Sequence, residues 1–231
     1  MTERLFGRLK IFRDSTAQSA AINMSMDEAL LESATIPTIR FYRWRSPSLS
    51  FGYFGKFSDV AVYAAEREPV RRWTGGGMVL HGDDLTYSIV IPASDPVCNE
   101  SSTLIYEKIH RALAEALNEL GKHAVVAGAV DSGRTTLSTR AAGNDCFAKP
   151  VRADVMMDGR KIAGAAQRRT RRGLLQQGSI QGFRLDADLA GKFAHALGVD
   201  CSTLEIDEQI FGRARELAQQ KYGTDSWLRL R

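Results

Sequence analysis

The chain has 231 residues, of which 44% are hydrophobic and 25% are charged. Such a composition is typical of a globular protein with a sizeable core, organised as one large domain or as a domain with a small appendage. The net charge of +4 suits an anionic ligand or an acidic partner protein, but it is too small to indicate nucleic-acid binding. No apolar stretch has the length of a membrane span, and the N-terminus lacks the apolar core of a signal peptide, so we expect neither.

The cysteines are odd in number and widely spaced, at Cys98, Cys146 and Cys201. This spacing fits neither a disulfide framework nor a metal site. We therefore expect no bound metal and a reducing, cytoplasmic location.

Hydrophobic periodicity and turn residues predict an α+β fold in which hairpins are interspersed with a few helices. Single strands are expected at 5–13, 38–44, 48–54 and 123–130. Within 78–92, one strand is expected on each side of a turn at 82–84, and two hairpins are expected with turns at 158–159 and 171–173. The expected helices lie at 19–33, 58–67, 101–120, 186–198 and 207–221. Asn23 or Ser25 is the expected cap of the first helix and Ser58 that of the second, while 131–143 is expected to be a loop.

Three consecutive glycines follow two cations, in the order Arg71, Arg72, Trp73, Thr74, Gly75, Gly76, Gly77. Glycines allow backbone N–H groups to approach a ligand closely, and successive N–H groups form a nest for carbonyl or phosphate oxygens. The arginines could add charge-assisted hydrogen bonds to an anion. The alternative is a hairpin turn flanked by two surface arginines.

A second informative stretch runs from 144 to 169. Cys146 is either a nucleophile or a small buried hydrophobe, and Lys161 is either functional or a solvated lysine after the Asp158-Gly159 turn. The residues from Ala163 to Ala166 are all small, which indicates either a group packed closely over the strand or simply a tightly packed strand. A lone histidine near a turn, such as His81 beside the 82–84 turn, is more often structural or solvated than catalytic.

Two long motifs carry a resemblance to a known family. Arg71-Arg72-x-Thr-Gly-Gly-Gly-x-Val-x-His, followed by Leu-Thr-Tyr-Ser at 85–88, resembles the signature of the lipoate–protein ligase and octanoyltransferase family. The segment 158–167 resembles that family's lysine segment, and 23–31 and 44–52 are similar to its weaker motifs. The resemblance covers about residues 8–185; biotin ligases share the fold but match the glycine motif less well.

The resemblance implies a mixed sheet wrapped by helices, as in the biotin and lipoate ligase catalytic domains, with an acyl tunnel beside the glycine loop. It implies a catalytic domain over 1–190 and, over 191–231, a short C-terminal helical tail of the same domain. Lys161 and Cys146 are the implied catalytic residues. The implied substrate-binding residues are Arg71, Arg72, Thr74, Gly75, Gly76, Gly77, His81, Tyr87, Ser88, Gly164, Ala165, Ala166, Gly178 and Ser179.

The product implied by the resemblance is an amide on the lysine of a lipoyl carrier domain, of the glycine cleavage H protein or dehydrogenase E2 type. Two branches of the family differ in how the acyl group is activated. The segment from Cys146 to Lys161 looks like the cysteine loop of the branch that takes octanoyl from an acyl carrier protein thioester, without a tightly bound cofactor. The complete triplet, including Gly77, and the tail at 221–227 look more like the ligases, which use ATP and Mg²⁺ to form an acyl-adenylate.

Gln177 stands where many members of the family have a histidine, which bears on the transfer mechanism. A third hypothesis, from another class, is a non-catalytic lipoyl-binding module. Lys161 and the cation pair argue against it. We expect the transferase, with neither nucleic acid nor membrane as a partner.

Overall fold

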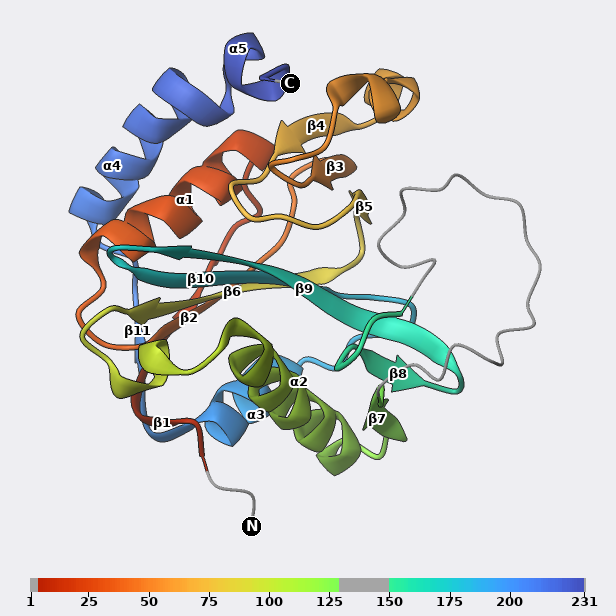
Figure 1. Ribbon diagram of the computed structural model, residues 1–231, viewed down its shortest axis with the longest axis vertical. Coiled ribbons are helices and arrows are strands. Elements are labelled where there is room, and N and C mark those ends of the chain that lie inside the picture. Colours follow the sequence, from red (N-terminus) through yellow and green to blue (C-terminus); the bar gives the residue numbers. More distant parts are fainter. Residues whose placement is uncertain (1–3, 129–149, 231) are drawn as a thin grey trace.

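The computed structural model of the chain describes residues 4–128 and 150–230. Within them, the strands form an eight-stranded mixed sheet and a separate three-stranded sheet (Figure 1). In chain order the strands are β1 (Phe6–Arg13), β2 (Thr38–Tyr42), β3 (Ser48–Phe51), β4 (Glu68–Arg71), β5 (Val79–His81), β6 (Leu85–Pro92), β7 (Ala124–Val126), β8 (Val155–Met157), β9 (Arg160–Thr170), β10 (Gly173–Ile180) and β11 (Gly198–Leu204). The α-helices are α1 (Ala20–Ser33), α2 (Ser102–Glu119), α3 (Leu189–Leu197), α4 (Glu208–Leu217) and α5 (Asp225–Leu228).

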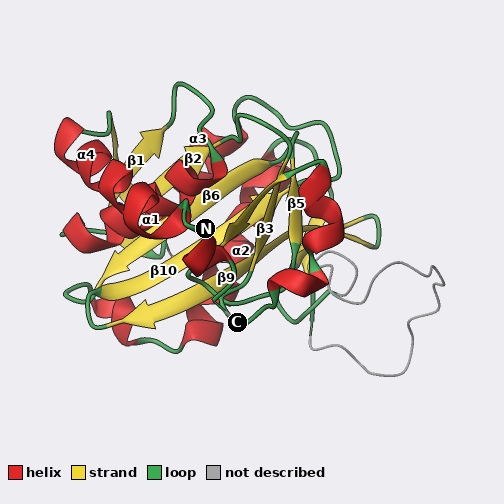
Figure 2. Ribbon diagram, turned by 90° about the horizontal axis from the view of Figure 1, so that it is seen from above, coloured by secondary structure: helices red, strands yellow, loops and turns green. Residues whose placement is uncertain are grey.

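The large sheet has the strand order β11-β1-β2-β6-β10-β9-β8-β7. The pairs β11·β1 and β1·β2 are parallel, and the remaining pairs are antiparallel. Helices α1 and α4 cover one face and α2 and α3 the other (Figure 1). The small sheet, β4-β3-β5, lies on the α1 side, and the long strands β6, β10 and β9 run side by side beneath it (Figure 2).

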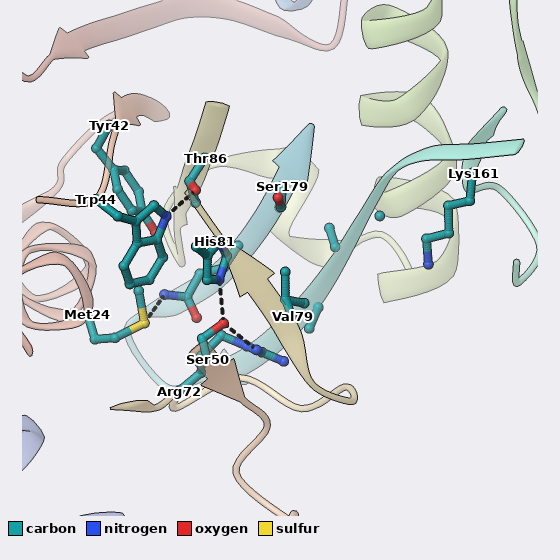
Figure 3. A pocket seen from close by; sticks show the side chains of 15 residues that line it. Met24, Tyr42, Trp44, Ser50, Arg72, Val79, His81, Thr86, Lys161 and Ser179 are labelled. Atoms are coloured by element: carbon teal, nitrogen blue, oxygen red, sulfur yellow. Dashed lines mark hydrogen bonds between the residues drawn. The ribbon is translucent and has the colours of Figure 1, made fainter. Parts of the chain in front are cut away.

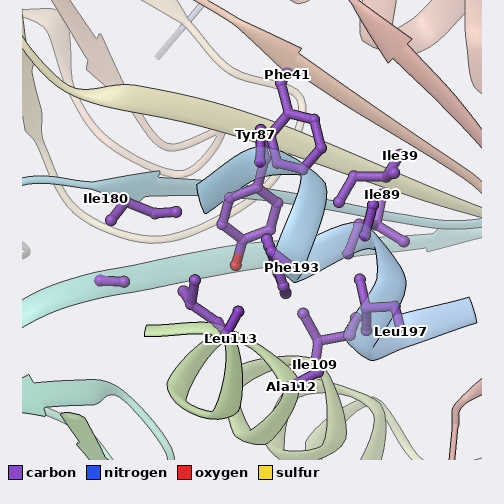
Figure 4. Close-up of a cluster of buried hydrophobic side chains, with 14 of the residues drawn as sticks. Ile39, Phe41, Tyr87, Ile89, Ile109, Ala112, Leu113, Ile180, Phe193 and Leu197 are labelled. Atoms are coloured by element: carbon purple, nitrogen blue, oxygen red, sulfur yellow. The ribbon is translucent and has the colours of Figure 1, made fainter. Parts of the chain in front are cut away.

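Strand β6 is buried on both faces, as its apolar run predicts. Tyr87 and Ile89 pack into the main core with α2 and α3 (Figure 4), and Ile91 belongs to the same core cluster. Ser88 and Val90 point to the α1 side, because side chains alternate along a strand. This strand therefore links the main core to the layer that contains the functional motifs.

The first helix and both hairpins are confirmed, but the cap of the first helix and the helix type expected at 58–67 differ from expectation. Helix α1 is capped by Ser19, whose hydroxyl accepts from the N–H of Ile22, so the expected caps Asn23 and Ser25 were wrong. Both lie inside the helix, where Ser25 donates to a backbone carbonyl of the preceding turn. The expected helix at 58–67 is instead two 3₁₀ turns, Phe57–Asp59 and Ala61–Ala65. Both hairpins, with turns at 158–159 and 171–173, are confirmed.

Two features of the topology were not predicted. Strands β5 and β6 flank one turn but belong to different sheets: β5 pairs with β3, and β6 pairs with β2 and β10. Strand β11, inside the segment expected to be a helical tail, pairs in parallel with β1 at the edge of the large sheet. Its side chains are mostly exposed, so the segment lacks the apolar alternation from which a strand is predicted. The domain division at residue 190 stays a prediction.

Candidate active site

A pocket lies where the small sheet faces β6, β10 and β9. Figure 3 shows Lys161 at one end of it and Trp44, His81 and Ser50 at the other. Its lining comes from segments far apart in the chain: Met24, Tyr42, Trp44, Ser50, Arg72, Val79, His81, Thr86, Lys161, Gly164, Ala165, Ala166, Gln177, Gly178 and Ser179. The lining combines aromatic and apolar side chains, small residues of β9 and β10, and Lys161 at one end, so the pocket suits an extended apolar chain with a polar end.

Many of the expected site residues are brought together here: Arg72, His81, Lys161, Gly164, Ala165, Ala166, Gly178 and Ser179. Cys146 lies outside the described residues, so its expected role stays a prediction. Sequence reasoning did not single out Met24, Tyr42, Trp44, Ser50, Val79 and Thr86 as lining residues. Val79 and Thr86 do fall within the quoted signature, and Met24, Trp44 and Ser50 fall within the two weaker family-like segments, which was the available signal; Tyr42 lies outside all of these motifs.

Lys161 is nearly buried, with a side chain 6% exposed, and its Nζ lies 2.8 Å from Oδ2 of the fully buried Asp154. The solvated-lysine alternative was therefore wrong. Lys161 lies over Gly164, because a Cβ built at that glycine would stand 2.5 Å from Cε and 2.6 Å from Nζ of the lysine. The small-residue strand thus does have a group packed closely over it, and that group is the lysine of the same motif.

Arg72 holds the glycine loop. Its Nη2 donates to the carbonyls of Gly75 and Gly77 at 2.9 and 2.8 Å, and its Nη1 donates to Ser50 Oγ at 2.7 Å. On the other side of the loop, a Cβ at Gly52 would lie 2.0 Å from the carbonyl oxygen of Gly76. Only a glycine allows the two backbone segments to approach so closely.

Arg71 is fully buried and Arg72 is only 6% exposed, so the surface-arginine alternative was wrong for both cations. Its guanidinium donates to the carbonyls of Tyr53 and Gly55 and to those of Trp227 and Leu228 in α5. These bonds fasten the C-terminal segment to the glycine-loop region. Arg71 is not among the described residues that line the pocket, and its expected substrate contact stays a prediction.

His81 lies in a buried hydrogen-bonded chain. Its Nδ1 is 2.8 Å from Asp84 Oδ2, its Nε2 is 2.7 Å from Ser50 Oγ, and its ring stacks on Trp44 with centroids 4.0 Å apart. Burial lowers the pKa of His81. Burial opposes ionisation of Asp84, but the hydrogen bonds from His81 and Ser179 bring the pKa of Asp84 to about 2. A neutral His81 therefore donates to Asp84 through Nδ1 and accepts the Ser50 hydroxyl proton at Nε2.

Gln177 connects the glycine loop to α1. Its Oε1 accepts from Thr74 Oγ1 at 2.8 Å, and its Nε2 donates to Asp27 Oδ2 at 2.7 Å. Asp27 also accepts from Ser88 Oγ at 2.6 Å. Two of the expected substrate-binding residues, Thr74 and Ser88, are therefore bound into this buried network; neither is among the described lining residues, and their substrate contacts stay predictions.

Tyr87 points to the opposite face of the large sheet. Its hydroxyl is 3.0 Å from His110 Nε2, and its ring lies edge-on to Phe193, with centroids 5.2 Å apart. A Cβ at Gly178 would stand 2.3 Å from the Tyr87 ring, so this glycine makes room for the tyrosine. Tyr87, like Gly75, Gly76 and Gly77, is not among the described lining residues, and its substrate contact stays a prediction.

No group of three or more His, Cys, Asp or Glu side chains within residues 4–128 and 150–230 is placed to hold a metal ion. In the same residues, no helix has both the length and the apolar character needed to cross a bilayer.

The model of the lipoyl protein ligase A/B catalytic domain family matches residues 19–203. The octanoyltransferase LipM of Oceanobacillus iheyensis is 40% identical over 177 residues, which are 73% of this chain and 62% of that protein. The octanoyltransferase LipM of Geobacillus kaustophilus is 39% identical over 179 residues, which are 73% of this chain and 64% of that protein. The matches thus span somewhat less than two thirds of the length of these relatives.

Solved structures show the same fold. A lipoate-protein ligase A bound with ATP superposes with a TM-score of 0.73 at 23% identity, covering 96% of this chain and 98% of the other. A bipartite lipoate protein ligase from Thermoplasma acidophilum, studied with its E2 lipoyl domain, superposes with a TM-score of 0.65 at 22% identity, covering 97% and 96%. With the family model matched over most of its length, the chain belongs to the lipoyl protein ligase A/B catalytic domain family.

Proposed function

We propose that this protein is an enzyme that transfers an octanoyl group from an acyl carrier protein thioester to the lysine of a lipoyl carrier domain. The observation that carries the proposal is a nearly buried lysine, Lys161, at one end of a pocket whose other end is aromatic. The names of the relatives at 37–40% identity support the same activity.

In the first step, the Cys146 thiolate attacks the carbonyl carbon of the octanoyl thioester. The C–S bond to the carrier breaks, and the proton of the Cys146 thiol leaves with the carrier thiol. In the second step, the deprotonated lysine amine of the lipoyl domain attacks the new thioester. An amide forms, and Cys146 is released as a thiol.

Both steps develop negative charge on the carbonyl oxygen. The Lys161 ammonium donates to that oxygen, with backbone N–H groups of the glycine loop as further donors. Because Lys161 lies in a nearly buried site, its charge acts there with less screening than at the surface. The octanoyl tail extends along the small residues of β9 and β10 toward Trp44 and His81.

The second candidate is ATP-dependent ligation of lipoate or octanoate. The complete glycine triplet, including Gly77, favours it, and so does the tail segment that ends in Trp227, which packs on Tyr222 with ring centroids 5.7 Å apart. In that mechanism Arg72, Lys161 and the glycine loop hold an acyl-adenylate, ATP and Mg²⁺ are required, and Cys146 takes no part. The E2 or H-type carrier and the cytoplasmic location stay predictions under either mechanism.

Intact-mass analysis of the enzyme and a lipoyl domain separates these candidates. One reaction contains octanoyl acyl carrier protein without ATP, and the other contains free octanoate or lipoate with ATP and Mg²⁺. Cys146→Ala is compared with Cys201→Ala, which changes a half-buried cysteine on the edge strand β11. We expect a hydroxylamine-sensitive octanoyl adduct and carrier modification without ATP, both lost only in Cys146→Ala.

Carrier modification that needs ATP and survives Cys146→Ala would establish the ligase instead. No modification in either reaction, together with retained binding of octanoate or lipoate, would favour the binding module.

A further inference from the structure

Asp154 lies against Lys161, and both of its carboxylate oxygens are occupied. Oδ2 accepts from Lys161 Nζ at 2.8 Å and from the backbone N–H of Val151 at 2.7 Å. Oδ1 accepts from the Tyr106 hydroxyl at 2.6 Å. A fully buried carboxylate is stable as an anion only when it is paired and hydrogen-bonded in this way.

Tyr106 reaches this site from α2, on the other side of the sheet. Its hydroxyl donates to Asp154 and accepts from the backbone N–H of Ala165 at 3.1 Å. Ala165 lines the pocket, so Tyr106 sets the position of Asp154 relative to the pocket wall. Burial and the nearby Asp154 charge raise the pKa of Tyr106, so its hydroxyl keeps the proton that it donates.

The backbone before Asp154 is also held in an unusual conformation. Ala153 has a φ of 70°, which is rare for a residue with a side chain. The Ala153 carbonyl accepts from Nδ1 of the buried His110 at 2.6 Å, and Nε2 of His110 is 3.0 Å from the Tyr87 hydroxyl. Burial lowers the pKa of His110 to about 4, so a neutral ring donates to Ala153 and accepts from Tyr87. This buried chain fixes the turn that directs Asp154 to Lys161.

We propose that Asp154 and Tyr106 are positioning residues for Lys161, and that they act through it on the acyl oxygen. The proposal rests on the proposed function, in which Lys161 binds that oxygen. An ammonium has three N–H donors, so a bond to Asp154 is compatible with a second bond to an acyl oxygen. The carboxylate holds the amine over Gly164, and Tyr106 holds the carboxylate in place.

The first test compares Asp154→Asn and Tyr106→Phe with wild type in steady-state octanoyl transfer. Displacing a group by about 1 Å costs up to about 100-fold in rate, so we expect kcat to fall by about 100-fold in Asp154→Asn and by about 10-fold in Tyr106→Phe. KM for the octanoyl donor should change little, because the tail-binding wall is untouched.

The matched control is Glu107→Gln, which neutralises a carboxylate on α2, the helix that carries Tyr106. Glu107 pairs with Arg111 and Arg152 on the surface and does not contact Lys161 within the described residues. We expect wild-type kcat and KM for this variant.

A second test does not depend on transfer activity. Pulse labelling with an acetyl N-hydroxysuccinimide ester, followed by peptide mass analysis, measures the reactivity of Lys161 relative to the surface residue Lys192. In wild type the Lys161 amine is nearly buried and bound to Asp154. Removing this partner releases the amine to the reagent, so Lys161 should label faster in Asp154→Asn and at the wild-type rate in Glu107→Gln.

If wild type shows no transfer, the proposed function fails and the labelling result still decides the position of Lys161. Wild-type kcat in folded Asp154→Asn, or unchanged Lys161 labelling in that variant, would overturn the positioning role. If Asp154→Asn does not fold, Tyr106→Phe keeps both measurements informative, because it removes one hydroxyl from a site that remains paired.

Discussion

Replacing Gly164 by alanine should separate activity from stability. The added Cβ would lie 2.5 Å from Cε and 2.6 Å from Nζ of Lys161. Non-bonded heavy atoms settle at about 3.5 Å or more, so the end of the lysine must move by roughly 1 Å. A displacement of that size costs about 100-fold when the moved group is part of the reacting arrangement.

The stability of Gly164→Ala should stay close to that of wild type. Overpacking a core costs about 1–3 kcal/mol, but here the atoms in the way belong to the end of a flexible lysine that borders the pocket. Alanine also returns about 0.5–1 kcal/mol relative to glycine within a strand. The net change in the free energy of unfolding should therefore remain within about 1 kcal/mol.

The assay measures initial rates of octanoyl transfer to a lipoyl domain over a range of donor concentrations, alongside urea unfolding. Gly7→Ala is the matched control, because Gly7 lies on the exposed face of β1 and a Cβ there meets nothing within 4 Å. We expect kcat to fall about 100-fold in Gly164→Ala alone. A folded Gly164→Ala with more than half of the wild-type kcat would refute the argument, and a rise in KM alone would indicate that the methyl group narrows the pocket without disturbing Lys161.

Three further changes test other parts of the structure. In Gly52→Ala, the Cβ would stand 2.0 Å from the Gly76 carbonyl oxygen, and the backbone cannot move aside as the end of a lysine side chain can. Urea unfolding should therefore show a free energy of unfolding about 1–3 kcal/mol lower than that of wild type, and octanoyl transfer should be lost. His110 has a pKa of about 4 in the folded protein against about 6.5 in the unfolded chain, so the folded state is favoured where the ring is neutral and loses stability as the pH falls below 6.5. The free energy of unfolding should therefore be about 2 kcal/mol lower at pH 5 than at pH 7.5, and His110→Gln should remove this pH dependence. In Arg71→Lys, the fork that binds the Trp227 carbonyl is lost, so limited trypsin digestion should release the C-terminal segment faster than from wild type, and an unchanged digestion rate would show that α5 docks without it.

The functional motifs could be predicted because their chemistry is local in the sequence. Lys161 and Gly164 lie on one strand after a strong turn signal, so the sequence places them on the same hairpin. Residues three apart on a regular strand face opposite sides, however, and their contact depends on a register shift in β9 opposite Val155 and Met156 that the sequence does not show. The main helices and the buried strand β6 were predictable from periodicity for the same reason. Helix caps were not, because Ser19, Asn23 and Ser25 are all acceptable N-cap residue types and only the backbone selects among them.

The partners of the motif residues could not be predicted, because they come from distant segments. Tyr106 is a residue of the most regular helix in the chain, and nothing in that helix distinguishes its hydroxyl from any other until α2 packs beneath β9. Ser50 and His81 meet only because β3 and β5 pair in a sheet that the sequence pattern does not separate from the larger one. In a sequence, arginines next to glycines indicate anion binding, yet the Arg72 guanidinium donates hydrogen bonds to the backbone carbonyls of the glycine loop itself.

Gln177 shows how the same reasoning changes once the contacts are known. As an isolated departure from the histidine of many family members, it raises doubt about a substrate-binding or basic group. In the structure its amide both accepts from Thr74 and donates to Asp27, so it joins the glycine loop to α1 without carrying a proton that titrates near neutral pH. A neutral histidine in its place could make both bonds only as one tautomer, and protonation would break the bond from Thr74. The glutamine therefore joins the loop to α1 without a titrating group of its own, and the reacting groups of the pocket are Lys161 and, in the proposed mechanism, Cys146.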